Sequence, residues 1–224
     1  MQPVVRLRSA VCLLGRFPAL AGVDLDVEAG EVILLSGGNG AGKTTLLRLL
    51  AGLVPLHTGE AEVLGHDLTV DRSSHRRELA LVGHETACYE DLTVLENASF
   101  AARAGGATTD DARTALDTVG LTRLLDVRHS KLSEGQRRRL TLAIALARDP
   151  KLLLLDEPHA GLDAEGRTAL DETLRSAAAG GRTVLLASHE LDRARALASR
   201  EVVLTGGQAH GELQSTPVPD KAHT

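Results

Sequence analysis

Three short runs of apolar residues constrain the fold of this chain more than any other feature. They are Val32–Leu35, Leu152–Leu155 and Val184–Leu186, and each is continuously hydrophobic rather than alternating with polar residues. Such runs are typical of strands buried on both faces of a parallel sheet that helices cover. Because each run ends in polar residues, we expect those polar groups to meet at the carboxyl edge of one sheet, where open α/β sheets bind ligands.

The remainder of the chain divides into strand-like and helical patterns. Residues 23–27 alternate apolar and polar side chains, as an antiparallel strand with one solvent-exposed face does. Residues 61–64 and 202–204 are short and β-prone, and Gly206-Gly207 offers a hairpin turn after the second of them. Apolar residues at helical spacing occupy the middle of the chain, at 98–104, 110–119 and 136–147.

These patterns predict an α/β fold in a single domain over residues 1–224. Residues 1–83 and 150–210 are expected to form the core, with a mostly parallel sheet and an antiparallel β subdomain. Residues 84–149 are expected to form an inserted helical lobe, and residues 211–224 a flexible tail.

The composition excludes several classes of function. With 25 Lys and Arg against 30 Asp and Glu, the formal net charge is −5, so no nucleic-acid partner is expected. The two cysteines, Cys12 and Cys88, are too few for a disulfide framework and fit a reducing compartment. No apolar run approaches the roughly 18–20 residues of a membrane helix, and the start lacks the apolar stretch of a signal peptide, so we expect a cytoplasmic protein.

The segment after the first apolar run, Gly37 to Thr44, fits the pattern G-x-x-x-x-G-K-[ST] of P-loop NTPases. Glycines let such a loop turn its N–H groups toward phosphate oxygens, and the helix expected from about Gly42 adds the positive end of its dipole. We expect Lys43 to contact the β- and γ-phosphates of a nucleoside triphosphate and the Thr44 hydroxyl to ligate Mg²⁺. The residues predicted to bind the nucleotide are Gly37, Asn39, Gly40, Ala41, Gly42, Lys43, Thr44 and Thr45.

The second apolar run delivers two acidic residues, Asp156 and Glu157, to the same edge of the sheet. Asp156 is placed to hold Mg²⁺, directly or through water, and Glu157 to orient or deprotonate an attacking water. A strand that merely ends in solvent gives the same short pattern, but its position after a phosphate loop favours the catalytic interpretation. The adjacent acid also favours hydrolysis over phosphate transfer to a small-molecule acceptor.

The segment Leu132–Gln136, with the sequence LSEGQ, resembles the LSGGQ signature of ATP-binding cassette (ABC) ATPases, with Glu134 in place of the first glycine. The other motifs of that family occur in the family's order over roughly residues 4–210. They are the phosphate loop, Gly83-His84-Glu85 where a glutamine-centred loop is usual, the signature, Asp156-Glu157, Ala160–Asp163, which is similar to the D-loop, and Ser188-His189, which is similar to the switch-histidine loop.

The resemblance implies the ABC ATPase fold and a division of the ATP site between two chains. Two such domains pair head to tail, and each ATP lies between one phosphate loop and the signature of the partner. The resemblance therefore implies ATP and Mg²⁺ as cofactors and a homodimer as the active unit. It implies that Ser133, Gly135 and Gln136 bind the partner's ATP, and that Asp163 communicates across the dimer. Its catalytic residues would be Glu157, His189, which contacts the γ-phosphate, and Lys43.

This sequence departs from the family pattern at three places. His84 stands where glutamine is usual, so whether it ligates Mg²⁺ or only contacts Mg²⁺-bound water is left open. Glu134 brings a negative charge near an incoming phosphate, which is tolerable if its side chain points away. Leu14 aligns with an aromatic residue that often stacks on adenine, with Phe17 nearby, so base stacking is expected to be weak.

His84 together with the L-S-x-G-Q form of the signature is similar to the ATP-binding subunit of the haem exporter of cytochrome c biogenesis. The predicted function is therefore ATP hydrolysis that powers transport, with export of haem as the specific form, through separate integral membrane subunits at the inner face of the cell membrane. Two alternatives stay open. One is the ATPase of a drug or lipid exporter, and the other is a soluble ABC ATPase without a transport role, such as an iron–sulfur assembly factor.

Three further expectations concern the surface. Residues 84–97 are expected to dock the membrane partner, with Glu85, Glu90 and Glu96 available to its basic loops. Arg137-Arg138-Arg139 is interpreted as a solvated helix face, and the histidines other than His84 and His189 as surface residues.

Overall fold

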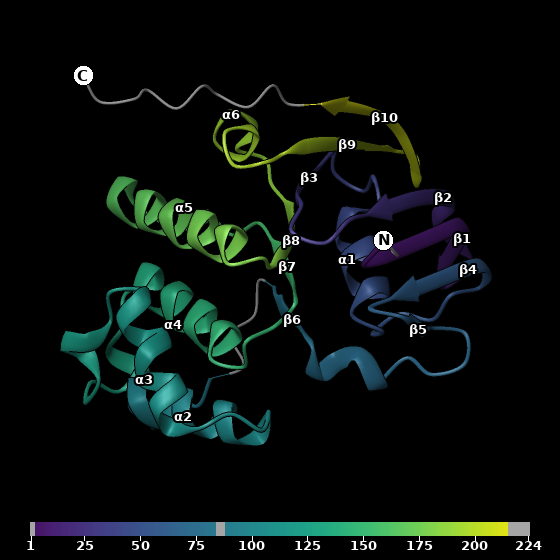
Figure 1. Ribbon diagram of the computed structural model, residues 1–224. Helices are drawn as coiled ribbons and strands as arrows, with labels where there is room; N and C mark the ends of the chain where they lie inside the picture. The colour runs from purple at the N-terminus through teal and green to yellow at the C-terminus, as the bar shows by residue number, and fades with distance from the viewer. Residues whose placement is uncertain (1–2, 84–87, 215–224) are drawn as a thin grey trace.

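Two β-sheets and a group of helices make up the structure, a computed structural model that describes residues 3–83 and 88–214 (Figure 1). The larger sheet is parallel except for one edge strand, which pairs antiparallel with its neighbour. Its strands lie in the order β10 (Gln208–Gln214), β9 (Arg200–Thr205), β3 (Val32–Ser36), β8 (Thr183–Ala187), β7 (Leu152–Asp156) and β6 (Leu79–Val82).

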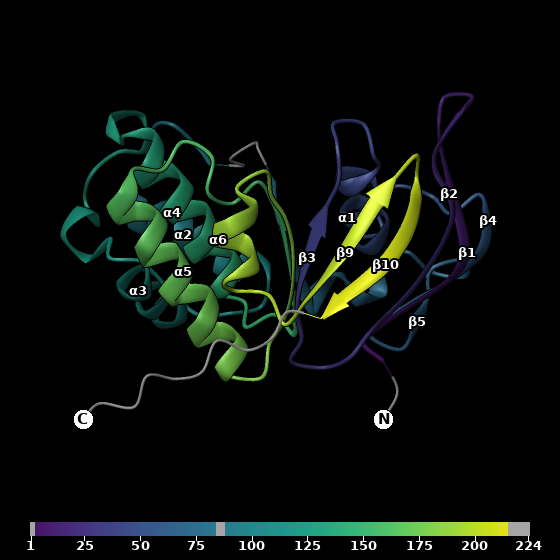
Figure 2. The same ribbon diagram turned by 90° about the horizontal axis from the view of Figure 1, so that it is seen from above.

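The smaller sheet is antiparallel and lies on one side of the larger one. Its strands lie in the order β2 (Phe17–Val27), β1 (Val5–Leu14), β4 (Thr58–Val63) and β5 (His66–Asp67). Helix α1 (Lys43–Leu50) packs between the two sheets, where its four leucines join Ile33 and Leu35 in one buried cluster (Figure 2).

The other side of the larger sheet is covered by helices (Figure 2). Three of them, α2 (Val94–Ala104), α3 (Thr109–Thr118) and α4 (Glu134–Leu146), form a lobe at one end of the molecule, at the lower left of Figure 1. Helices α5 (Ala164–Ala179) and α6 (Leu191–Arg195) lie beside this lobe, and short 3₁₀ turns occur at 74–77, 122–124 and 129–131.

Strand β3 explains why the first apolar run is continuous. Val32 and Leu34 belong to the buried cluster on the helical side of the sheet, whereas Ile33 and Leu35 belong to the cluster around α1. Successive side chains of a strand point to opposite faces, so a strand covered on both faces needs an apolar residue at every position. The three apolar runs form the neighbouring strands β3, β8 and β7, as the sequence predicted.

Several other predicted elements are confirmed. The alternating residues 23–27 end strand β2, Gly206-Gly207 joins β9 to β10, and the three helical patterns form α2, α3 and α4. The prediction of a tail from residue 211 is wrong for its first four residues. Strand β10 continues to Gln214, which pairs with Arg200, because the exposed edge of β9 supplies hydrogen-bonding partners.

Candidate nucleotide site

The phosphate loop connects β3 to α1 and depends on glycine at two positions. Gly37 has a φ of 137°, and a Cβ there would lie 2.1 Å from the carbonyl oxygen of Leu204. Gly42 is the N-cap of α1 with a φ of 107°, and a Cβ there would lie 2.7 Å from the carbonyl oxygen of Ala19. A side chain at either position would therefore collide with the main chain of another strand.

Lys43, the first residue of α1, is folded back over the loop. Its side-chain Nζ donates hydrogen bonds to the carbonyl oxygens of Gly37 at 2.7 Å and Gly38 at 3.0 Å, and the residue is 8% exposed. The ammonium group thus lies over the loop residues predicted to hold phosphate. There it can exchange its hydrogen bonds to carbonyl oxygens for hydrogen bonds to phosphate oxygens.

Thr44 and Asp156 lie next to each other although they are 112 residues apart in the chain. The Thr44 hydroxyl donates a hydrogen bond of 2.8 Å to Oδ2 of Asp156, at the end of β7. A hydroxyl and a carboxylate are oxygen ligands of the kind that Mg²⁺ takes together with water and phosphate oxygens. The Thr44 hydroxyl and the Asp156 carboxylate therefore fit a magnesium ion as its ligands.

Glu157 and His189 also meet, as the sequence predicted from two strand ends. Oε1 of Glu157 lies 3.2 Å from Nε2 of His189, and Oε2 accepts a hydrogen bond from the His189 main-chain N–H at 3.1 Å. Glu157 has a φ of 51°, in the left-handed region, and its N–H donates to the carbonyl oxygen of Ala187. The carboxylate is thereby oriented by two groups of the loop that follows β8.

These groups line one cavity of about 450 Å³, a volume within the range typical of small-molecule sites. Leu14 forms part of its wall, whereas Phe17 does not line it and is exposed. The lining residues are Leu14, Ala19, Asn39, Gly40, Ala41, Gly42, Lys43, Thr44, Thr45, Arg48, Asp156, Glu157 and His189.

The signature residues lie elsewhere, at the start of α4. Ser133 caps this helix: its Oγ accepts a hydrogen bond from the Gln136 N–H at 3.3 Å, and Oε1 of Gln136 accepts one from the Ser133 N–H at 2.9 Å. Neither residue lines the cavity of the phosphate loop, nor does Gly135, whose Cα faces Leu162. The chain therefore brings together only the phosphate-loop half of the expected site.

Asp163 caps α5 and accepts a hydrogen bond of 2.8 Å from the Gly166 N–H, so its carboxylate has a local structural partner. The Glu134 side chain lies against the loop between β7 and α5, because a Cβ on Gly161 would be 2.4 Å from Oε1 of Glu134. Its side chain is thus directed along the chain's own D-loop. The prediction for His84 falls outside the described residues, as does the one for Glu85.

The interpretation of Arg137-Arg138-Arg139 as a solvated face is wrong, because all three residues are half-buried and one of them, Arg138, reaches the core. Its guanidinium is partly buried and donates to main-chain carbonyl oxygens at the ends of β6 and β7. Burial lowers the pKa of this guanidinium, and the carboxylates of Asp156 and Glu157 oppose the shift. Which of three consecutive arginines points inward is set by how α4 packs on the sheet, and the sequence carries no local signal of it.

Three histidines that were expected on the surface are buried. His75 Nε2 donates a hydrogen bond of 2.8 Å to the Leu50 carbonyl oxygen, and His129 is 3% exposed. His159, 1% exposed, has Nε2 at 2.8 Å from Oδ1 of Asp171 on α5, and Oδ2 of Asp171 binds Arg193 on α6. The partners of His75 and His159 lie in other segments of the chain, which is why the sequence did not reveal these contacts.

Glu96 is exposed and has a local partner, and its contact with a partner's basic loops stays a prediction. Its carboxylate accepts a hydrogen bond of 2.7 Å from the Thr93 N–H and completes the capping box of α2. Two hydrogen bonds from Thr93 lower the pKa of Glu96, which keeps this carboxylate ionised in its capping role.

Comparison with known proteins identifies the family. A family model described as "ABC transporter" matches residues 20–160, more than half of the chain. The chain belongs to the ABC transporter family. In the described ranges, with residues 84–87 left aside, this ABC protein has no helix that is long and apolar enough to cross a bilayer.

Two bacterial relatives illustrate the similarity in sequence. The sulfate/thiosulfate import ATP-binding protein CysA 1 of Rhizobium meliloti is 38% identical over 228 residues, which cover 98% of this chain and 64% of the relative. The sulfate/thiosulfate import ATP-binding protein CysA of Methylococcus capsulatus is 38% identical over 213 residues, covering 91% and 61% respectively. The chain thus spans less than two thirds of the length of these relatives.

Solved structures of ATP-binding cassettes share the fold. The dimeric post-hydrolysis state of the cassette MJ0796, bound to ADP and Pi, superimposes with a TM-score of 0.86 at 25% identity, covering 96% of this chain and all of that one. The ATP-binding subunit of an ABC transporter superimposes equally well, at 27% identity, over 94% of this chain and 90% of the other. The fold is that of the ABC ATPase cassette.

Proposed function

We propose that the chain is the ATP-hydrolysing subunit of an ABC transporter. The observation that carries the proposal is the convergence of four functional groups on one cavity at the carboxyl edge of the sheet: the Lys43 ammonium, the Thr44–Asp156 pair, the Glu157 carboxylate and His189. Each suits a different part of an ATP molecule bound with Mg²⁺.

The phosphate loop and the N-terminal end of α1 bind the triphosphate. Loop N–H groups and the Lys43 ammonium bind the β- and γ-phosphate oxygens, and the N-terminus of α1 favours their negative charge. The Thr44 hydroxyl and the Asp156 carboxylate would both ligate Mg²⁺. When bound, this ion neutralises charge on the phosphates and fixes their orientation.

Glu157 directs the attacking water, and His189 positions the Glu157 carboxylate. A carboxylate next to the γ-phosphate can accept a hydrogen bond and a proton from water as the water attacks phosphorus in line with the leaving ADP oxygen. The contact between Glu157 and His189 orients the carboxylate, and the imidazole then lies within reach of the γ-phosphate.

A second copy of the chain completes the site in this proposal. The cap at Ser133 presents main-chain N–H groups at the start of α4 but lies outside the cavity of its own phosphate loop. Head-to-tail pairing would place this helix N-terminus against the ATP of the partner, where its dipole favours phosphate. Asp163, the N-cap of α5, would communicate across the dimer.

The test is the Glu157→Gln variant with ATP and Mg²⁺. We expect it to bind ATP as the parent does, to lose at least about 100-fold in kcat because the water lacks its acceptor, and to accumulate as a dimer in light scattering. Glu172→Gln, the same change at an exposed position of α5, is the control and should hydrolyse at the parent rate. Hydrolysis by Glu157→Gln at the parent rate, or a monomer under all these conditions, would contradict the proposal.

For the cargo we propose haem export, through membrane subunits at the inner face of the cell membrane, on the basis of the His84 loop and the L-S-x-G-Q signature. Sulfate import is the second candidate, because relatives at 38% identity carry that name. Deletion of the gene separates the two: loss of haem-stained c-type cytochromes supports haem export, whereas failure to grow on sulfate as sole sulfur source supports import. A deletion strain with neither defect would refute both candidates.

A further inference from the structure

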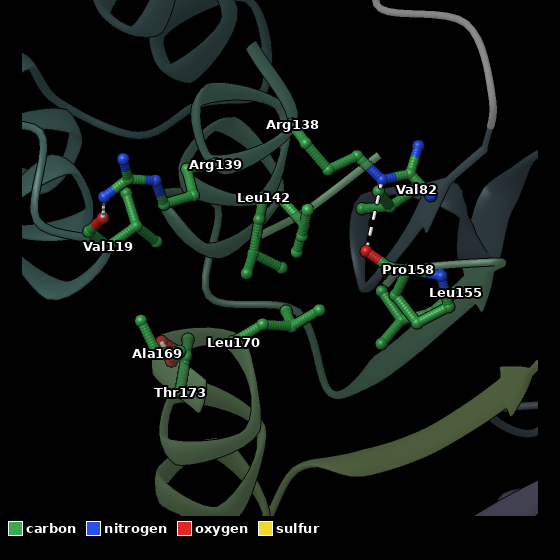
Figure 3. Close-up of a pocket in the computed structure, with 11 residues that line it drawn as sticks. Val82, Val119, Arg138, Arg139, Leu142, Leu155, Pro158, Ala169, Leu170 and Thr173 are labelled. Atoms are coloured by element: carbon green, nitrogen blue, oxygen red, sulfur yellow. Dashed lines mark hydrogen bonds between the residues drawn. The ribbon is translucent and has the colours of Figure 1, made fainter. Parts of the chain in front are cut away.

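Arg138 makes more hydrogen bonds across the boundary between the helical lobe and the core than its place among three arginines suggests. Its Nη2 donates to the carbonyl oxygens of Asp156 at 2.8 Å and Glu157 at 2.6 Å. Its Nη1 donates to the carbonyl oxygen of Gly83, after β6. Its Nε donates to the carbonyl oxygen of Pro158 at 3.4 Å, the bond drawn at Arg138 in Figure 3. All three guanidinium nitrogens are therefore directed at main-chain oxygens of the core.

Two of these bonds fix the main chain of Glu157. The carbonyl oxygens of Asp156 and Glu157 belong to the two peptide groups that flank the Glu157 Cα, so the orientation of these groups defines φ and ψ of Glu157. The φ of 51° lies in the left-handed region, which is unfavourable for a non-glycine residue and persists only when its surroundings hold it. The Arg138 guanidinium is one of the groups that hold it.

Within residues 3–83 and 88–214, the two neighbouring arginines of α4 do not make such bonds to the core. Arg137 donates to the carbonyl oxygen of Ser130, and Arg139 to that of Val119, so both bonds stay within the lobe. Beneath Arg138 lies a small apolar void of about 10 Å³, the size of one water, lined by residues of α4, α5 and the sheet such as Leu142, Leu155 and Leu170 (Figure 3). The apolar contact is thus incomplete where the guanidinium bridges it.

We propose that Arg138 is a positioning residue for ATP hydrolysis, which sets the main-chain conformation of Glu157 from the helical lobe. The inference rests on the proposed function, in which Glu157 directs the attacking water. Ser133 and Arg138 are five residues apart on α4, or about 7.5 Å along the helix axis. The helix that presents the signature to the partner therefore also holds the acid of its own site, so a displacement of the lobe would move both.

The test replaces Arg138 by Met and, as a matched control, Arg137 by Met. For Arg138→Met we expect kcat to fall about 10- to 100-fold, because a displacement of about 1 Å of a reacting group can cost that much. The KM for ATP and the Kd for a fluorescent ATP analogue should stay within about twofold, because the phosphate loop is untouched. Arg137→Met should keep the parent kcat, and Arg138→Lys, which can reach one or two of the four oxygens, should fall between.

A double-mutant cycle separates positioning from a general loss of structure. In the Glu157→Gln background, Arg138→Met should change the single-turnover rate less than twofold, because the group it positions no longer acts. An equal loss in both backgrounds, a rise in KM or Kd that matches the fall in kcat, or parent activity in Arg138→Met would overturn the inference. Should Arg138→Met not fold, Arg138→Lys carries the same cycle. Parent activity in Glu157→Gln alone would instead refute the proposed function.

Discussion

The buried cluster of His159, Asp171 and Arg193 allows a quantitative prediction of stability. Asp171 is 5% exposed and uses one carboxylate oxygen for His159 and the other for Arg193. Replacing it by Leu leaves His159, which is buried, without its partner, at a cost of about 1–3 kcal/mol. The Arg193 side chain is 32% exposed, so water replaces Asp171 as its partner. Loss of this ion pair adds only about 1 kcal/mol.

The sum predicts that Asp171→Leu lowers the free energy of unfolding by about 3 kcal/mol, which corresponds to a fall in Tm of about 6–12 °C for a chain of this size. Asp171→Asn should cost only about 1–1.5 kcal/mol, since the amide oxygen can still accept from Arg193 and the amide N–H can donate to a ring nitrogen of His159.

Differential scanning calorimetry of the two variants and the parent measures these effects at one pH and one protein concentration. Asp192→Asn, on the exposed face of α6, is the control and should shift Tm by less than about 2 °C. Equal melting of Asp171→Leu and the parent would refute the reasoning, because it would mean that the carboxylate adds no net stability. An equal loss of stability in Asp171→Leu and Asp171→Asn would contradict the prediction that the amide still forms hydrogen bonds with Arg193 and His159.

Three other predictions follow from single positions. Gly37→Ala should abolish binding of a fluorescent ATP analogue, because the added Cβ would lie 2.1 Å from the Leu204 carbonyl oxygen; binding at the parent Kd would contradict this. Hydrogen bonds from Arg195 lower the pKa of Glu201, so their stabilisation is complete above the unfolded-state pKa of about 4.3 and is lost as the pH falls through the lower folded-state pKa. Glu201→Gln should therefore lose about 1–2 kcal/mol in urea unfolding at pH 7 and a smaller amount in acid, and an equal loss at both would count against the pair. Burial raises the pKa of Cys12 to about 11, so mass spectrometry should find it unalkylated by iodoacetamide at pH 8 until the protein unfolds.

The sequence predicts the centre of this fold well because local pattern and tertiary environment agree there. The first four residues of β3, Val32–Leu35, each face one of two apolar clusters, so four consecutive apolar residues indicate burial on both faces. The phosphate loop and the Asp156-Glu157 pair are equally local, since each is a short segment at a strand end. The long first strand β1 and helix α5 were not predicted. Strand β1 is interrupted at Ser9, which has a φ of 45° and lies where the pairing with β2 shifts register.

The interactions that the sequence did not reveal are those between distant segments. The Arg138 guanidinium reaches oxygens 18 to 55 residues away, and His159 reaches Asp171 across a loop and a helix turn. In both cases the residue type is compatible with a solvated surface, and only the packing of α4 and α5 on the sheet decides otherwise.

The cap of α4 has a consequence for how recognition and folding can be separated. The Ser133 oxygen uses a lone pair to accept from the Gln136 N–H, which leaves its single proton free to be donated elsewhere. Aspartate at this position would still accept and end the helix properly, but it would offer no proton and would add a repelling charge. The Ser133 hydroxyl can therefore accept the hydrogen bond that caps α4 and donate its own proton to a bound anion. A substitution can remove the second role and leave the first in place.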